Sequence, residues 1–479
     1  LGVHTLTLSG GGTLANTNAL RLDQSDSTLA LDGIGLVGAV SVTADANAGK
    51  GLKVGQSATL GKLSVEAAAL LEIADNQTLG GPVTLNPNSS LEISGGGDFT
   101  GDLDLAGGAL RVSDNRSLSG TVGVSADSVM IVSDDASLTL SQSGGLAVGG
   151  STLTLNGGGA VRGSSLQLDN AASQLRLSGI TVDNVSTSSN SLGILVDNAS
   201  TVNNLSLGNL VPLSISGGQR LSGGITVNSG GTLKITDNGT LASEVTMQGG
   251  TLDVDESLAL SGGLVQSGDA TVNVSSGKTL TFPNDLSIGP HALTLQGAGL
   301  YAFVDNASAL VLDEADSLLN MQGSGRIQAL KVAAVSNVGK GLNHTGSMTI
   351  GRMMLAADMT LAVQNEVIVE DAVSVENIRF KLQGPGVLRS NVILDNSTLE
   401  ILDSLSLAGN LEHRRSSTIQ INSSAILTTG GEAPIAVNNQ TLTFAGAGTL
   451  ANAQAVVLND NASRLVFSGA NTVDNVTVN

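Results

Sequence analysis

The sequence contains no cysteine and no tryptophan, and aromatic residues make up 1% of its 479 positions. Without cysteine there is neither a disulfide framework nor thiol chemistry. Aromatic rings normally supply a large part of a globular core, at roughly 150–250 Å² of buried area each. The core must therefore be built from leucine, valine, isoleucine and alanine, and we expect it to be thin and aliphatic.

Basic residues are also scarce, because 21 Lys and Arg stand against 41 Asp and Glu, a net charge of −20. Nucleic acids are bound by clustered Lys and Arg, so this composition argues against a nucleic-acid partner. The acids are spread along the chain, as on a solvated surface that keeps a protein soluble. Bridging of such surfaces by Ca²⁺ is the alternative, but no motif supports it, and we expect no cofactor.

Long apolar runs are absent as well. No stretch reaches the ~18 apolar residues of a membrane-spanning helix, so we expect no transmembrane segment in this chain. The sequence starts at Leu1 without an initiator methionine or a signal peptide. Hydrophobic residues nevertheless make up 41%, which argues against disorder. We expect a folded segment of a longer protein.

Glycine, by contrast, is abundant, with 62 residues, and one glycine-rich phrase occurs four times. Its form is x-[TA]-L-T-[LF]-x-G-[GA]-G, and its copies begin at His4, Ser151, His291 and Gln440, at intervals of 147, 140 and 149 residues. We therefore divide the chain into four repeat units: 1–150, 151–290, the less regular 291–439, and 440–479, which we expect to continue beyond Asn479. The third unit also carries an insertion at Phe303–Leu310.

Each copy of the phrase is followed by two leucines that lie seven residues apart, with a polar turn between them and a glycine four residues later. Glycines at such fixed places indicate positive φ or a close approach between neighbouring segments. No Lys-Ser or Lys-Thr follows the phrase, so it is not a phosphate-binding loop. The structural repeat glycines are Gly10, Gly12, Gly157, Gly159, Gly297, Gly299, Gly446, Gly448, Gly33, Gly179, Gly323 and Gly469.

A shorter rhythm runs inside the units. Apolar anchors recur at Leu71, Leu91, Leu110 and Val129, and again at Leu213, Leu233, Leu252 and Val272, in steps of 19 or 20 residues. Short alternating strands with this period, separated by turn residues, are typical of a solenoid, in which coils stack because no single coil can bury its apolar face.

The predicted fold is therefore all-β, a right-handed parallel β-helix (β-solenoid), because crossovers between parallel strands are right-handed in nearly all cases. Coils of about 20 residues give about 7 coils per long repeat and about 24 in the chain. We also expect stacked Asn or Ser side chains at equivalent turns to form ladders.

The residues from Phe467 to Asn479 read FSGANTVDNVTVN and resemble the passenger-associated repeat of bacterial autotransporters, of the general form LSGANTYTGGTTVN. Leu6–Gly10 and Leu153–Gly157 look like the leading strand of that repeat, although Val473 stands where tyrosine is usual. In style the chain also resembles the β-helical shafts of secreted adhesins such as the filamentous haemagglutinins. The resemblance implies export from a Gram-negative-like cell and an extracellular, cell-surface location.

The acidic and histidine side chains are the candidates for catalytic chemistry in this sequence. Glycan-cleaving β-helices need paired carboxylates, often with aromatic platforms for sugars. The close pairs are Asp134 with Asp135, Asp253 with Asp255, and Glu314 with Asp316, and each lies in a turn or an alternating strand. The histidines, His4, His291, His344 and His413, lack metal-ligand spacing. The basic cluster His413–Arg415 has no aromatic neighbour in sequence and is interpreted as a solvated turn. We predict no catalytic, cofactor or metal site.

The sequence thus favours a non-enzymatic shaft segment of a secreted bacterial cell-surface fibre or adhesin. Its partners would be further copies of itself, and the surface of a host or neighbouring cell. The alternative is a carbohydrate-active β-helix, such as a lyase or a phage tailspike, which would want aromatic platforms. An ice- or surface-binding solenoid would want regular threonine columns, and Thr226, Thr246 and Thr271 do not keep such a register.

Overall fold

A computed structural model describes residues 1–141 and 145–479, and these fall into two compact units, Leu1–Glu244 and Val245–Asn479. The described residues contain no helix; 58% are in strands, which form a parallel β-solenoid of about 22 turns with about 21 residues per coil. The predicted all-β solenoid is confirmed. The division into four repeat units, which is inferred from the positions of the phrase, remains a prediction. Among the described residues, no helix could span a bilayer.

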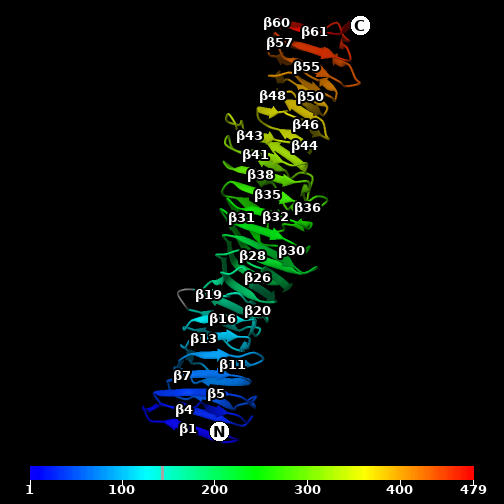
Figure 1. Cartoon of the computed structure of the whole chain (residues 1–479). Helices are drawn as coiled ribbons and strands as arrows, with labels where there is room; N and C mark the ends of the chain where they lie inside the picture. Colours follow the sequence, from blue (N-terminus) through cyan, green and yellow to red (C-terminus); the bar gives the residue numbers. More distant parts are fainter. Residues whose placement is uncertain (142–144) are drawn as a thin grey trace. The chain divides into compact units, whose positions relative to one another are not determined.

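Within each unit, successive coils contribute one strand each to a parallel sheet, here called sheet A. In unit 1 its strands are β1 (Thr5–Ser9), β4 (Thr28–Asp32), β6 (Gly51–Val54), β8 (Ala68–Ile73), β11 (Ser90–Ser94), β14 (Ala109–Val112), β17 (Ser128–Val132), β20 (Thr152–Asn156), β23 (Gln174–Ser178), β25 (Gly193–Asn198), β27 (Leu210–Ile215) and β29 (Thr232–Ile235). In unit 2 they are β32 (Thr251–Val254), β35 (Ala270–Val274), β38 (Ala292–Gly297), β41 (Leu318–Gln322), β43 (Gly341–His344), β45 (Met359–Ala362), β48 (Arg379–Gln383), β51 (Thr398–Ile401), β54 (Ser417–Ile421), β57 (Thr441–Gly446) and β60 (Arg464–Gly469). Figure 1 shows these strands lying side by side within each unit.

Strand alternation builds the core. In β29, Leu233 and Ile235 are 0% and 1% exposed, whereas Thr232 and Lys234 face outward and are half-buried. Burying such an aliphatic side chain contributes roughly 1.5–3 kcal/mol. The few aromatic residues are mostly interior as well, since Phe99 and Tyr301 are among the largest fully buried side chains. The expected aliphatic core is confirmed, and the few rings add to it, with Phe282 packed against Phe303 and Phe444 against Phe467.

The four phrases occupy one structural position. Each phrase strand pairs in parallel with the strand of the next coil. The leucine of the phrase thereby lies beside the second of the two leucines that follow it: Leu6 beside Leu29, Leu153 beside Leu175, Leu293 beside Leu319, and Leu442 beside Leu465. These partners lie 23, 22, 26 and 23 residues apart in the chain. Because these coils exceed 20 residues, the expectation of about 24 coils is wrong, and the chain makes about 22.

A longer correspondence links the two units. Asn47 donates from its Nδ2 to Asp26 Oδ1 over 3.0 Å, and Asn337 donates to Asp316 over 2.9 Å. The donor positions, 47 and 337, differ by 290 residues, and so do the acceptor positions, 26 and 316. The same coil is therefore built twice, at corresponding places in the two units.

The predicted ladders are confirmed at several turns. Asn479 donates to Asn459 over 2.8 Å, and Asn459 donates to Asn438 over 2.8 Å, so that three coils carry one amide column. Asn204 donates in the same way to Asn184, on the neighbouring strand, over 3.1 Å. Such contacts satisfy outward polar groups between coils without requiring charge.

The remaining faces are formed by long strands that bend. In unit 1, β5 (Leu36–Val42) pairs with both β2 (Thr13–Leu14) and β3 (Leu20–Leu22). In unit 2, β42 (Arg326–Val332) pairs likewise with β39 (Leu300–Phe303) and β40 (Leu310–Leu312). The segment between each pair of short strands leaves the sheet and lies beside the bend, and in unit 2 this segment is the insertion noted in the sequence.

Candidate functional site

The repeat glycines form a corner at the end of a sheet A strand. Gly157 has φ +106°, and a Cβ on it would lie 2.0 Å from the Val132 carbonyl oxygen of the preceding coil. A Cβ on Gly159 would lie 2.4 Å from the Ser133 carbonyl oxygen. The first glycine therefore supplies a left-handed turn and the third permits close coil stacking. A hollow of about 460 Å³ lies beside this corner, and Gly158, Gly159 and Arg162 are among the residues that line it.

Except for Gly12, the other repeat glycines show at least one of these two features, a positive φ or a close approach to another atom. Positive φ occurs at Gly10, Gly297, Gly446, Gly33, Gly179 and Gly469. Gly12, Gly299, Gly448 and Gly323 do not have positive φ, and a Cβ on the last three would come within 2.3 Å of another atom.

Sequence reasoning missed two further corners of this kind. Gly95 and Gly97 follow β11, and Gly384 and Gly386 follow β48, with φ of +86° at Gly95 and +107° at Gly384. Their preceding strands lack the Leu-Thr-Leu signature, so the search for that phrase did not find them. The spacing of glycine, any residue, glycine after an alternating strand was the available signal.

A serine in each polar turn was also missed; three of the four are buried and Ser463 is half-buried. The Ser317 hydroxyl is in a side chain that is 0% exposed, donates to the Gly289 carbonyl oxygen over 2.6 Å, and accepts from the Glu314 N–H over 3.0 Å. Ser27 and Ser173 donate to the equivalent carbonyl oxygens of the preceding coil, those of Gly2 and Gly149. Ser463 donates to the carbonyl oxygen of Val437, which lies one position earlier relative to the phrase. Each hydroxyl ties a turn to the coil before it, which is a structural role.

The acidic pairs are engaged in contacts between coils. Asp253 accepts from Asn273 over 2.7 Å and Asp255 accepts from Ser275 over 3.0 Å, both one coil further on. Asp134 accepts from the Gly158 N–H over 2.9 Å. Among the residues that the structure describes, no three His, Cys, Asp or Glu side chains form a group that could hold a metal ion.

The histidines have separate environments. His4 is exposed and His291 is half-buried, whereas His344 and His413 are 7% and 6% exposed. The ring nitrogens of His344 lie 2.6 Å and 2.7 Å from the carbonyl oxygens of Gly346 and Ala362. Burial lowers the pKa of His413, and the charge of Asp395 partly offsets that effect.

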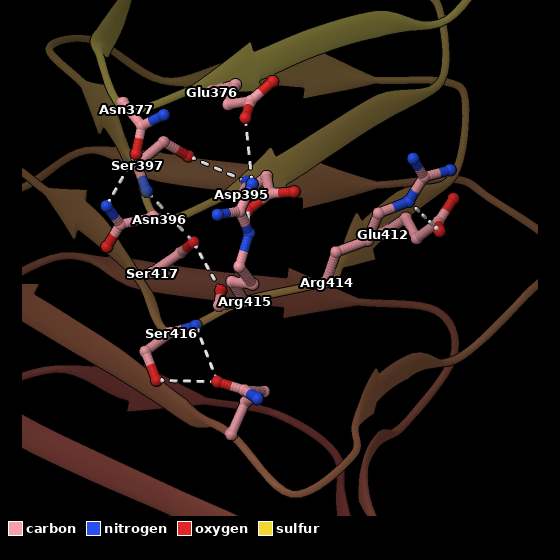
Figure 2. A network of polar contacts seen from close by, with 11 residues as sticks. Glu376, Asn377, Asp395, Asn396, Ser397, Glu412, Arg414, Arg415, Ser416 and Ser417 are labelled. Carbon is pink, nitrogen blue, oxygen red and sulfur yellow. Dashed lines mark hydrogen bonds and ion pairs between the residues drawn. The ribbon is translucent and has the colours of Figure 1, made fainter.

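Figure 2 shows that carboxylates lie around the basic turn after His413, Glu412 from the same coil and Glu376 and Asp395 from the preceding coils. Arg415 donates to Glu376 over 2.9 Å and also contacts Asp395. Arg414 donates to Glu412 over 2.8 Å. Both guanidinium groups are thus neutralised within the coil stack, and Asn396 adds an amide contact of 2.7 Å to Asn377 beside them. The cluster is a coil-to-coil fastening rather than a free cationic patch.

Unlike polar groups also gather at the bend of unit 2. A hollow of about 320 Å³ is lined by Asn306, Arg326, Gln328, Ala329, Gly351, Arg352, Glu370 and Asp371. Arg326 donates from Nε to Glu370 Oε1 over 2.9 Å, reaching past the intervening coil, and this contact lowers the pKa of Glu370. Arg352 reaches in the other direction, to the Asn306 carbonyl oxygen.

This hollow adjoins two others. A space of about 370 Å³ shares Arg352 and Asp371 with it, and one of about 310 Å³ shares Glu370. We call these three spaces together the bend groove. Gly351 lines this groove and lets two coils pack closely there, because a Cβ at Gly351 would lie 2.5 Å from the Gln328 carbonyl oxygen of the preceding coil. None of its lining residues was predicted as a site from sequence.

Comparison with known proteins adds no relative, because no family model, no curated protein and no solved structure matches this chain. The functional argument therefore rests on the coil stack and on the surfaces it presents.

Proposed function

We propose that this chain is a shaft segment of a secreted bacterial cell-surface fibre or adhesin, of the autotransporter or filamentous-haemagglutinin kind. The segment converts chain length into reach and presents its outer faces to other copies of itself or to another cell. The proposal includes no catalytic step and no cofactor. Its location would be extracellular, as the resemblance of FSGANTVDNVTVN to the passenger-associated repeat implies.

The observation that supports this proposal best is the repetition of one coil design by parallel pairing. β1, β4, β6 and β8 pair in succession, as do β45, β48, β51 and β54. Each coil satisfies the strand edge of its neighbour, so the design can be extended coil by coil. The outward Asn and Asp side chains also join coils to one another, which suits an element that bears load.

Electron microscopy of the native protein, released from the cell surface, tests the proposal. We expect thin filaments with an axial repeat of about 34 Å, from seven coils at about 4.8 Å each. Material unfolded in guanidinium and imaged without refolding is the control, and should show no filaments. A compact trimer that cleaves glycans would contradict the shaft and favour the carbohydrate-active alternative.

The carbohydrate-active alternative keeps one observation in its favour, the bend groove with its carboxylates. Glu370, however, is engaged by Arg326, and the single tyrosine of the sequence, Tyr301, is 1% exposed. A catalytic acid needs access to the leaving group. Assay of linear polysaccharides for new reducing ends decides the matter, and the shaft proposal expects none.

A further inference from the structure

The bend groove extends along the coil stack of unit 2. Its lining residues come from six successive coils, which contain β39, β42, β44 (Met348–Leu355), β46 (Glu366–Val369), β49 (Val387–Arg389) and β52 (Leu405–Leu407). Neighbouring strands lie about 4.8 Å apart, so six coils span about 24 Å. The groove therefore suits an extended ligand better than a compact one.

The chemistry of the groove is mixed and balanced. Three guanidinium groups line it, those of Arg326, Arg352 and Arg389, and so do three carboxylates, those of Glu370, Asp371 and Glu376. Arg326 is paired with Glu370, Arg389 with Glu366 and Glu376 with Arg415, so a ligand would share these groups with their present partners. Guanidinium groups only donate hydrogen bonds and carboxylates only accept them. A hydroxyl group does both, so a ligand rich in hydroxyls can use both kinds of partner.

A charged ligand fits less well. Carboxylates along the groove oppose a polyanion, and the net charge of −20 adds to that repulsion. The arginines oppose a polycation in the same way. A linear, uncharged, hydroxyl-rich chain meets neither penalty.

Comparison with unit 1 shows that these side chains are not needed to build the bend. Positions 290 residues before Gln328 and Asp371 are Gly38 and Gly81. A Cβ on Gly81 would lie 1.8 Å from the Leu60 carbonyl oxygen, and Gly81 has φ +100°, whereas Asp371 does not have positive φ. Unit 1 thus has glycines at these two positions, whereas unit 2 has an amide and an acid there. The unit 1 bend has its own hollow of about 710 Å³, whose lining includes Arg21, Lys62 and Glu66.

We propose that the bend groove binds a linear, uncharged oligosaccharide, with Arg352 and Asp371 at its centre as hydrogen-bonding residues. Both line two of the three hollows. Affinity comes from hydrogen bonds alone, because no exposed aromatic ring lines the groove to stack on a sugar. Such binding is weak for one molecule and becomes strong when many copies act together.

Saturation-transfer NMR and calorimetric titration of the full chain test this site. The probes are cellohexaose, maltohexaose and mannohexaose, with hexagalacturonate as the anionic comparison. We expect saturable binding of at least one neutral hexasaccharide. Arg352→Gln and Asp371→Asn should each lower the association constant at least tenfold, while circular dichroism stays unchanged.

Two variants serve as matched controls. Lys62→Gln alters the position 290 residues before Arg352, and Lys381→Gln alters a cation on sheet A. Neither should change binding by more than twofold. The proposal is overturned if no neutral probe binds, if only hexagalacturonate binds, or if Lys62→Gln weakens binding as much as Arg352→Gln does. None of these outcomes bears on filament formation, so the shaft proposal stands or falls separately.

Discussion

The bends of the two units fasten the looped segment to the long strand in opposite ways. In unit 1 the Asn16 carboxamide, from the looped segment, bonds to the long strand: Nδ2 donates to the Ala39 carbonyl oxygen over 2.7 Å and Oδ1 accepts from the Ala39 N–H over 3.2 Å. In unit 2 the Gln328 carboxamide, from the long strand, bonds to the loop. Its Oε1 accepts from the Phe303 N–H over 2.6 Å, and its Nε2 donates to Asn306 over 3.3 Å.

The difference teaches which parts of a coil are fixed. The bend requires that the loop be fastened to the strand, because unpaired peptide groups are costly when partly buried. It does not require a particular residue to supply the amide. In unit 2 the Asn306 backbone carbonyl also accepts from Arg352, which stands where unit 1 has Lys62.

Exchanging residues between the bends should have the largest effect. Gly81→Asp places the residue of unit 2 in unit 1, where its Cβ would collide with the Leu60 carbonyl oxygen at positive φ. We expect the free energy of unfolding to fall by about 3 kcal/mol or more, as measured by urea titration with circular dichroism.

The reciprocal change, Asp371→Gly, should cost about 1 kcal/mol or less, since it removes an exposed side chain and adds only backbone freedom. Gly123→Ala is the steric control, because nothing lies within 4 Å of a Cβ at that position. Equal losses from Gly81→Asp and Asp371→Gly would show that the two bends do not differ as described.

Removing the fastening amides should have the next largest effect. Asn16→Ala leaves both polar groups of the Ala39 peptide without their partner, and we expect a loss of about 2 kcal/mol. Gln328→Ala should cost about 1 kcal/mol, because its contact to Asn306 is longer and lies at an exposed residue. Thermal unfolding of both variants gives the comparison, and a larger loss from Gln328→Ala would reverse it.

The buried serines should show where the units agree. Ser27→Ala and Ser317→Ala each remove a hydroxyl that donates to the coil before, Ser27 over 2.5 Å and Ser317 over 2.6 Å. We expect each to lower the free energy of unfolding by about 1 kcal/mol, with less than about 0.5 kcal/mol between them. Urea midpoints at equal slope provide the measurement. A clear difference would mean that the two coils are not equivalent.

The smallest expected effect is on pH dependence and is confined to unit 2. Because burial lowers the pKa of His413 in the folded state, the unfolded chain binds more protons below the ordinary histidine pKa of about 6.5. Stability should therefore rise with pH through that range and be lost as pH falls. Urea midpoints measured between pH 5 and 8 should vary less in His413→Gln, and an unchanged pH profile in that variant would assign the dependence to other groups.

Much of the architecture could be predicted from the sequence, because inward positions repeat with the coil. Leu6 and Leu29 carry the same pattern that brings them together, and the glycine corners follow from it. The bend groove could not be predicted in that way. Arg326, Arg352 and Glu370 are 26 and 18 residues apart, in no shared motif, and only the observed stacking makes them neighbours. Outward positions keep the coil period only in places such as the Asn438, Asn459 and Asn479 column, and the residues of the bend groove show no such repeat.

The single tyrosine has an optical consequence. Tyr301 donates its hydroxyl to the Val272 carbonyl oxygen over 3.0 Å, and burial raises its pKa. With no tryptophan anywhere in the sequence, ultraviolet emission of the protein comes almost wholly from this ring and therefore from unit 2. During unfolding, the tyrosine emission will report on unit 2, whereas the far-ultraviolet circular dichroism will report on the strands of the whole chain. A solenoid whose units open at different denaturant concentrations would thus reveal itself without any added label.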